Sequence, residues 1–401
     1  MSSLKISNKL VLFDDTNEFN FVVKYSFKLL KPIIQDGSMK LKNYIYTLSI
    51  CAISAQTVYA SSYFKPSDKT DFKRYSISIG WLYAKPLGDA NNIDITTTIP
   101  AGSTYTVGDV TTQNILGAID QSTIQGQQVH TVISTIQGLG ISSLSADLSG
   151  TVNLNKPSNW TSPNTGLEVE DINTLGIMFN YYLNDNISLE LKAGIPPKVK
   201  AKGIGEIYAP VIGQVDLPPT STALIGTNNI PISQQIYVTD LAQSKYAIDT
   251  KVWMPAIEAH YQFGVSGINK FRPYVGVGIL YAYLENVKIN SGIENDLILA
   301  GHRVQNILTG KAGDSLAGIS SDAKPIIKIS TRNTFAPVFS VGFNYDFNSN
   351  WFAVASLSYS KMDIDAKIDV NNQNNNQNLI SGKVKIDVDP LISYMGIGYR
   401  F

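Results

Sequence analysis

Ionisable side chains recur at every second position in several apolar segments of this 401-residue chain. Glu190 and Lys192 form one such pair, and Glu258 and His260 form another. Residues two apart lie on the same face of a β-strand, so each pair would bring two charged groups side by side. A histidine next to a carboxylate can transfer protons, bind a metal or join a buried ion pair.

Catalysis is the least supported of these uses. A lipid-modifying hydrolase or acyltransferase would combine His260 with a serine or an aspartate, and no serine motif stands out in the sequence. His130 and His302 lack partners at metal-ligand spacing, and phosphate-binding and dinucleotide motifs are absent. We therefore predict that the protein is not an enzyme and uses no cofactor and no metal.

Eight segments would hold these residues on strands. Each segment alternates apolar with small or polar residues. Each is long enough to cross a hydrocarbon core as a tilted strand of about ten residues. The expected strands are 72–85, 173–183, 187–199, 250–263, 271–287, 334–347, 351–367 and 384–401.

The links between these strands alternate in length. Short, turn-forming links follow the second, fourth and sixth strands, whereas the other links are long and rich in Ser, Thr, Asn, Gly and Gln. Alternation of this kind is typical of outer-membrane barrels, whose short turns are periplasmic and whose long loops lie outside. We predict an all-β fold, an eight-stranded antiparallel, up-and-down transmembrane β-barrel with short periplasmic turns. Its long extracellular loops would be 87–172, 204–249, 288–333 and 369–383.

Three local patterns refine this prediction. The alternation in Thr131–Ile136 and in Leu144–Leu148 predicts an extra hairpin above the membrane, and the run Asn371–Asn378 predicts a flexible loop tip. The chain ends on the aromatic residues Tyr399 and Phe401, as a membrane strand that meets water would. We interpret these two residues as an assembly signal read by the barrel-assembly machinery.

The segment Met39–Ala60 reads as a secretory signal peptide. It has two lysines, an apolar stretch and a small-x-small site that places cleavage after Ala60. Residues 1–38 are then either a misassigned extension, with Met39 as the true start, or a genuine cytoplasmic segment or pro-segment. The mature barrel, 61–401, would lack the single cysteine, Cys51, and therefore any disulfide. The zero net charge gives nucleic-acid binding no electrostatic support.

The charged residues should face the inside of the barrel, because each would cost roughly 2–4 kcal/mol against lipid at mid-membrane. The predicted lumen charge network is Arg74, Glu190, Lys192, Glu258, His260 and Arg272, with Asp346 and Arg400 on the same face. One interpretation is that these charges pair across the narrow lumen and plug it. The other is that apolar residues on the same strands line a pocket above a charged floor, namely Leu82, Met178, Met254, Leu280, Leu284 and Met362.

Prolines interrupt several expected strands. Pro196 and Pro197 on the third strand and Pro255 on the fourth lack the amide hydrogen that a ladder requires. They predict either a weakened lateral seam, through which an apolar solute leaves sideways into the bilayer, or local kinks that shape the rim. Near Pro390 the apolar residues change parity, which predicts a bulge that restores register.

Five motifs, in this order and spacing, resemble the OmpW family of small outer-membrane proteins. They are Phe271-Arg-Pro-Tyr-Val-Gly-Val-Gly278, Asn350-Trp351, Lys361-Met-Asp-Ile-Asp365, Asp389-Pro390 and Gly398-Tyr-Arg-Phe401. The resemblance covers 72–86, 173–203 and 250–401 and leaves the long inserts unexplained. It implies a narrow, largely apolar lumen that passes small hydrophobic molecules, and some members resemble toxin or phage receptors. Ser360 and Lys192 stand where the family pattern has an aromatic and an aliphatic residue, which weakens the case for an apolar gate there.

We therefore expect a bacterial outer-membrane barrel that forms a narrow channel or binding pocket for the passive passage of small hydrophobic molecules. The alternative is a structural or surface-interaction barrel, such as an adhesin, an antigen or a toxin or phage receptor, that only displays its long loops. The expected partners are outer-membrane lipid, small hydrophobic solutes and the barrel-assembly machinery, and not nucleic acid.

Overall fold

The structure, a computed structural model, describes residues 72–401. The predicted signal peptide, its cleavage site at Ala60 and residues 1–38 lie outside the described residues. Within 72–401, no helix combines the length and the apolar character needed to cross a membrane.

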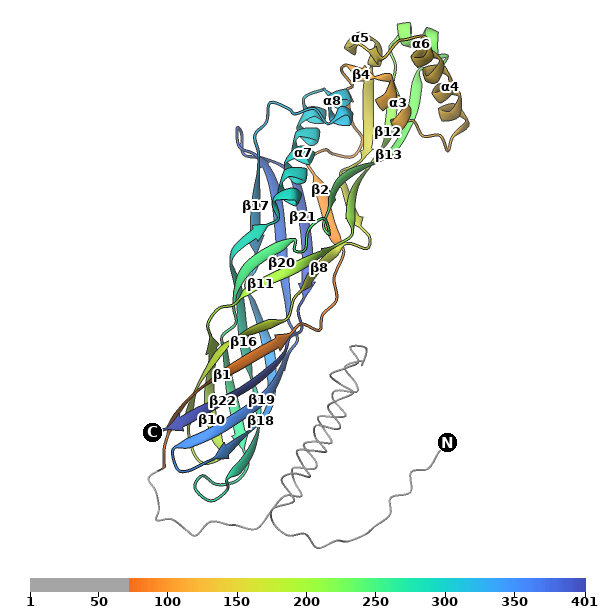
Figure 1. Cartoon of the computed structure of the whole chain (residues 1–401). Coiled ribbons are helices and arrows are strands. Elements are labelled where there is room, and N and C mark those ends of the chain that lie inside the picture. The colour runs from red at the N-terminus through yellow and green to blue at the C-terminus, as the bar shows by residue number, and fades with distance from the viewer. Residues whose placement is uncertain (1–71) are drawn as a thin grey trace, which may run out of the picture. The chain divides into compact units, whose positions relative to one another are not determined.

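Eight antiparallel strands form a closed barrel (Figure 1). Consecutive barrel strands pair with one another, and the first pairs with the last, so the sheet has no free edge. The barrel strands are β1 (Tyr75–Lys85), β9 (Ile172–Tyr182), β10 (Ile187–Gly194), β15 (Ala256–Gln262), β16 (Phe271–Ile289), β18 (Thr334–Asp346), β19 (Trp351–Ser360) and β22 (Leu391–Arg400). The predicted barrel and its strand order are confirmed. Four expected strands are each divided in two, at the prolines or at Lys361-Met362.

Beyond the long-link end of the barrel, the chain builds a second region that we call the extension. Strands β8, β11 and β14 continue the barrel sheet from β16, and five others form the separate sheet β17-β20-β21-β2-β7. The new strands are β2 (Ile93–Thr97), β7 (Asn159–Ser162), β8 (Gly166–Val169), β11 (Lys198–Ile204), β14 (Ile248–Trp253), β17 (Pro325–Thr331), β20 (Asp363–Asn372) and β21 (Gln377–Asp387). The long links are therefore largely folded.

Helix α7 (Ser291–Leu308) contacts β17, β20 and β21 of this sheet (Figure 1). The side chain of Asn290 caps its N-terminus by accepting a hydrogen bond from the amide of Gly292. Ala300, Val304 and Ile307 recur at a helical spacing and are buried. The helix thus presents an apolar face to the interior of the extension.

The outermost part of the extension, the tip, combines a four-stranded sheet with short helices (Figure 1). Its strands are β3 (Ser103–Thr106), β6 (Thr151–Lys156), β12 (Glu206–Asp216) and β13 (Asn229–Asp240), with the small pair β4 (Val110–Thr111) and β5 (Ser143–Leu144). Its helices are α3 (Thr112–Ala118), α4 (Ile124–Gly138), α5 (Ala146–Ser149), α6 (Pro219–Ile225) and α8 (Ala312–Ala317).

Two predictions for the links need correction. The hairpin expected from 131–136 and 144–148 is wrong. The first segment lies in α4, where Val129, Ile133 and Ile136 form a buried stripe at helical spacing, and the second is divided between β5 and α5. The run 371–378 does lie at a hairpin tip, but its ends continue the β20/β21 ladder, with Asn372 opposite Gln377. A short run of alternating apolar residues fits both the two-residue period of a strand and the 3.6-residue period of a helix. Tertiary packing decides which of the two forms.

The apolar face of the strands changes at the barrel rim. From Phe352 on β19 to Ile364 on β20, even-numbered residues are buried, and they change from Ser356, Ser358 and Ser360 in the barrel to Met362 and Ile364 in the extension. The odd-numbered, outward residues change from Leu357 and Tyr359 to Lys361 and Asp363. Lipid surrounds a membrane barrel whereas water surrounds what lies beyond it, so apolar side chains point out below the rim and in above it.

The same inversion explains the residues around Pro390. The amides of Val388 and Asp389 both bond to the carbonyl of Met362, as in a bulge. However, the even-numbered residues Ile386, Val388 and Tyr394 are buried on both sides of the break. A shift of register is therefore the wrong interpretation, because only the polarity of the two faces changes.

Candidate functional site: the lumen and the cavity above it

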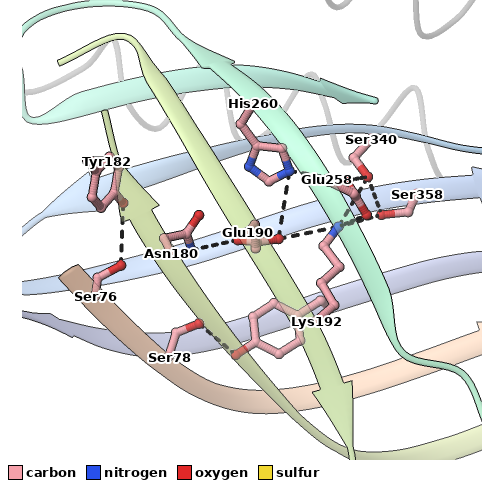
Figure 2. Close-up of polar contacts among 11 residues, drawn as sticks. Ser76, Ser78, Asn180, Tyr182, Glu190, Lys192, Glu258, His260, Ser340 and Ser358 are labelled. Carbon is pink, nitrogen blue, oxygen red and sulfur yellow. Dashed lines mark hydrogen bonds and ion pairs between the residues drawn. The ribbon is translucent and has the colours of Figure 1, made fainter. Parts of the chain in front are cut away.

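A cluster of charged side chains fills the middle of the barrel (Figure 2). Lys192 Nζ lies 2.6 Å from Glu258 Oε1 and 3.5 Å from Glu190 Oε1. His260 Nε2 lies 3.1 Å from Glu258 Oε2 and 3.8 Å from Glu190 Oε1. The two carboxylates are direct cross-strand partners and would repel each other, and Lys192 bridges them. These four residues pair on the neighbouring strands β10 and β15, and not across the lumen as predicted.

Neutral polar side chains complete this cluster (Figure 2). Lys192 Nζ donates to Ser340 Oγ at 3.1 Å and to Ser358 Oγ at 3.2 Å, and Ser340 donates to Glu258 Oε2 at 2.5 Å. Asn180 Nδ2 donates to Glu190 Oε2 at 2.7 Å. The sequence interpretation missed Asn180, Ser340 and Ser358, although their inward parity on the alternating strands was a usable signal.

The cluster does not form a serine–histidine pair. The hydroxyl of Ser340 donates to Glu258 and not to His260, and the bond of His260 Nε2 also goes to Glu258. The ring of His260 stacks on that of Tyr274 with centroids 4.6 Å apart. The geometry therefore suits a plug of paired ions, and it does not activate a hydroxyl nucleophile.

A second charged group lies toward the short-turn end of the barrel. Arg400 Nη1 is 2.7 Å from Asp346 Oδ1, and the guanidinium of Arg400 lies over the ring of Phe352, 4.3 Å from its centroid. Arg272 instead donates from Nη2 to the backbone carbonyl of Asp185. All three charged side chains are buried, and Arg272 is thus in the lumen but outside the central cluster.

Arg74 does not belong to the lumen network. It is exposed and donates from Nη1 to the carbonyl of Leu183 at 3.3 Å. Arg74 precedes Tyr75, where β1 begins. The alternation of inward and outward side chains along the strand therefore does not apply to Arg74. The prediction that Arg74 points inward is wrong for this reason.

An apolar cavity of about 170 Å³ lies above the cluster, inside the extension. Residues from both sheets and from α7 line it, and almost all of them are apolar. Met254, Leu284 and Met362, three of the six predicted pocket residues, contribute to its wall. Much of the remaining wall comes from links that the sequence interpretation treated as loops. A dry cavity of this size accepts a molecule as large as benzene.

The other three predicted pocket residues lie elsewhere. Met178 is buried inside the barrel with Tyr274, Phe352, Val354 and Tyr394. Leu280 belongs to the main hydrophobic core without facing the cavity, and Leu82 is partly buried beside two smaller clusters. The predicted pocket is therefore divided between the barrel interior and the extension.

The proline residues coincide with an interruption between β10 and β15. The ladder runs from Ile187 opposite Tyr261 to Lys192 opposite Ala256. It resumes between β11 and β14, where the amide of Val252 donates to the carbonyl of Pro197 at 3.2 Å. The interruption contains Pro196 and Pro255, and it adjoins Met254 in the cavity wall.

Tyr399 and Phe401 lie at the short-turn end of the barrel. The amide of Phe401 donates to the carbonyl of Tyr75 at 2.9 Å, and the two rings stack with centroids 5.9 Å apart. Tyr399 packs edge-on against Trp351. The contacts between Phe401 and Tyr75 join the last barrel strand to the first.

The family model and the curated relatives point to the same family. The model of the OmpW family matches residues 315–401. Outer membrane protein W of Salmonella typhimurium is 25% identical over 236 residues, which cover 59% of this chain and 76% of the relative.

Solved structures with a similar backbone path include OprG from Pseudomonas aeruginosa. It is 16% identical with a TM-score of 0.42, and the match covers 82% of this chain and 96% of that one. OmpW from E. coli is 17% identical with a TM-score of 0.29, over 82% of this chain and 98% of that one. Neither score bears on function. The family match over residues 315–401, the curated relatives and the closed eight-stranded barrel support membership of the OmpW family and a place in the bacterial outer membrane.

Proposed function

We propose that this protein lets small hydrophobic molecules pass the outer membrane through the cavity of the extension. The observation that carries the proposal is the cavity itself, which is about 170 Å³ and has an almost wholly apolar wall. Binding of an apolar solute is favoured by a transfer free energy of roughly 25 cal/mol for each Å² of its apolar surface that leaves water. The site offers little hydrogen bonding, so it selects for apolar character and size.

The charged cluster beneath the cavity would divert such a solute. To continue down the barrel it would have to separate Lys192 from Glu258, and breaking a buried ion pair is costly. The interrupted ladder beside Met254 offers a route with fewer hydrogen bonds to break. We propose that Pro196, Pro197 and Pro255 maintain this lateral seam and that the solute leaves through it into the bilayer.

Entry would begin at the tip. A second apolar cavity of about 80 Å³ lies between the tip sheet and its helices. Val211, Ile236 and Ile307 line both cavities, so single side chains separate the two spaces. A solute captured at the tip would therefore need only side-chain movement to reach the larger cavity.

One observation favours the alternative function, surface interaction. Ile124 and Leu139, at the two ends of α4, are each 77% exposed, and Leu224 on α6 is 64% exposed. In the alternative function these exposed apolar side chains would contact a partner. In this alternative the barrel would anchor the tip, and no solute would pass.

Uptake of toluene by cells that display the protein separates the two functions. Ala366 lines the cavity, and its neighbour Asp365 faces away from it on the same strand. Ala366→Trp should lower uptake about tenfold by filling the solute's space, while Asp365→Trp leaves it unchanged. Both variants must reach the membrane as heat-modifiable barrels. Uptake by Ala366→Trp equal to that of the unaltered protein would reject passage through the cavity.

A further inference from the structure

Two exposed lysines lie directly opposite each other just above the long-link rim of the barrel. Lys198 on β11 is the cross-strand partner of Lys251 on β14. Directly opposed residues of an antiparallel ladder project from the same face of the sheet, so the two ammonium groups share one patch of the outer surface. Like charges in this arrangement destabilise a sheet.

Other lysines near the rim have carboxylate partners, whereas this pair has none. Lys202 Nζ lies 3.5 Å from Glu170 Oε1, and Lys361 bonds to the carboxylate of Asp389. Among residues 72–401, neither member of the opposed pair has a hydrogen bond or an ion pair. The repulsion between the two lysines is therefore not offset by the polypeptide.

The carboxylate that could neutralise one of them is bound elsewhere. Glu285 on β16 lies opposite Lys251 in the ladder. However, its Oε2 accepts a hydrogen bond from Trp253 Nε1 at 3.1 Å. Glu285 thus fixes the indole of Trp253 and leaves the ammonium group of Lys251 without an anion.

Aromatic side chains beside the pair set its depth in the membrane. Trp253 stacks on Tyr283 with ring centroids 6.0 Å apart and 2° between the planes, and Tyr281 packs against Phe335 at 4.7 Å. Aromatic belts of this kind lie at the level of the lipid headgroups. Lys251 is two residues beyond Trp253, about 6.6 Å farther along the strand. Its ammonium group therefore lies where lipid phosphates do.

Below the aromatic belt, the same face of the barrel is apolar. Leu191, Ile257 and Ile279 are cross-strand neighbours on β10, β15 and β16. They are 50%, 55% and 54% exposed. A molecule with a charged head and acyl chains would thus find a partner for each of its parts on this face.

We propose that a lipid with a phosphate monoester headgroup binds here, with its phosphate between Lys198 and Lys251 and its acyl chains along Leu191 and Ile257. A phosphate monoester carries roughly two negative charges, which two ammonium groups balance. A phosphodiester headgroup carries only one and leaves part of the repulsion in place. The site goes beyond the proposed solute passage and does not depend on it.

Trp253 provides the readout for a test on the full chain. The chain keeps Trp253, has Phe at its other tryptophans and is reconstituted into phosphatidylcholine vesicles that contain a lipid with brominated acyl chains, which quench nearby indoles. Brominated phosphatidic acid, a monoester, should reach half-maximal quenching at a mole fraction about fivefold lower than that of brominated phosphatidylglycerol, a diester. Equal quenching by the two lipids would overturn the proposal.

Surface variants show whether the two lysines produce this preference. Lys198→Gln removes one cation, and Lys251→Glu gives Lys198 a carboxylate partner, so each should abolish the difference between the two lipids. Lys328→Gln is the matched control, because Lys328 is an exposed lysine on β17 of the extension, and it should retain the difference. A preference that survives Lys251→Glu would reject the site.

Two further measurements separate the site from other sources of attraction. A chain that keeps only Trp81, which is 54% exposed on β1, should show no preference between the lipids. The same preference at Trp81 would mean that anionic lipid gathers around the whole barrel and would contradict a site at the lysine pair. Inorganic phosphate should leave the preference at Trp253 unchanged, whereas its loss in phosphate would identify a site for the free anion and reject the lipid.

Discussion

The barrel and the extension are joined through the long strand β16, yet their apolar side chains point in opposite directions. In the barrel, Val277 and Phe339 are 55% and 60% exposed, whereas in the extension Leu379 and Val370 are 0% and 1% exposed. The barrel is ordered by its closed hydrogen-bond ladder, its lipid-facing surface and paired ions inside. The extension is ordered by a conventional hydrophobic core. One fold therefore has two sources of stability, and mutations can address each separately.

The largest effect should come from the ions inside the barrel. Lys192→Met leaves Glu190 and Glu258 facing each other without a fixed cation, and breaking a buried pair in this way costs about 3–5 kcal/mol of unfolding free energy. Lys198→Met, an exposed lysine on the continuation of the same strand, should change it by about 0.5 kcal/mol or less. Denaturant unfolding in detergent measures both, and equal losses would show that the cluster is not a stabilising plug.

The core of the extension should come next. Leu379→Ala removes a fully buried side chain, which costs about 2–5 kcal/mol depending on how the cavity relaxes. The loss should loosen the extension while the barrel stays folded. Limited proteolysis followed by unheated gel electrophoresis should then show a cleaved extension and an intact barrel band. Loss of the barrel band as well would contradict the division into two separately stabilised regions.

The outward faces give the third comparison. Val277→Arg places a charge against lipid and should cost about 2–4 kcal/mol. Asp365→Arg places the same side chain on the outward face of the extension and should stay within about 0.5 kcal/mol, because water surrounds it there. Folding titrations into lipid vesicles report both values. Similar costs at the two positions would mean that the polarity change at the rim does not mark the membrane boundary.

The end of the chain should have the smallest effect on stability. Deleting Phe401 removes its ring contact with Tyr75, worth about 0.5–1.5 kcal/mol. We propose that Phe401 and Tyr399 act mainly as the assembly signal, so the deletion should lower the amount of inserted protein more than the stability of what inserts. Membrane fractionation of cells checks this, and normal membrane levels of the shortened chain would reject the assembly role.

The barrel could be predicted from sequence because one face of each strand meets lipid and the other faces the lumen. Apolar residues therefore recur at every second position along each strand. The extension could not, since its strands are short, its polar outer residues resemble loop sequence and the burial of Trp160 or Ile207 depends on long-range packing. The alternation of inward and outward positions along the strands placed Glu258 and Lys192 inside the barrel. It could not show that Ser340 and Ser358 contact them. It failed at Arg74, where the strand has not yet begun.

The central claim is that the extension holds apolar solutes, and Trp160 reports on it directly because it lines the cavity. A chain that keeps Trp160 alone, with the other tryptophans replaced by Phe, should show saturable fluorescence quenching by bromobenzene, and Ala366→Phe should remove the saturable part. A chain that keeps only Trp351, which is 49% exposed at the short-turn end, should show quenching that rises without saturation as the quencher enters the detergent. Quenching of Trp160 that fails to saturate, or that Ala366→Phe leaves unchanged, would contradict the account.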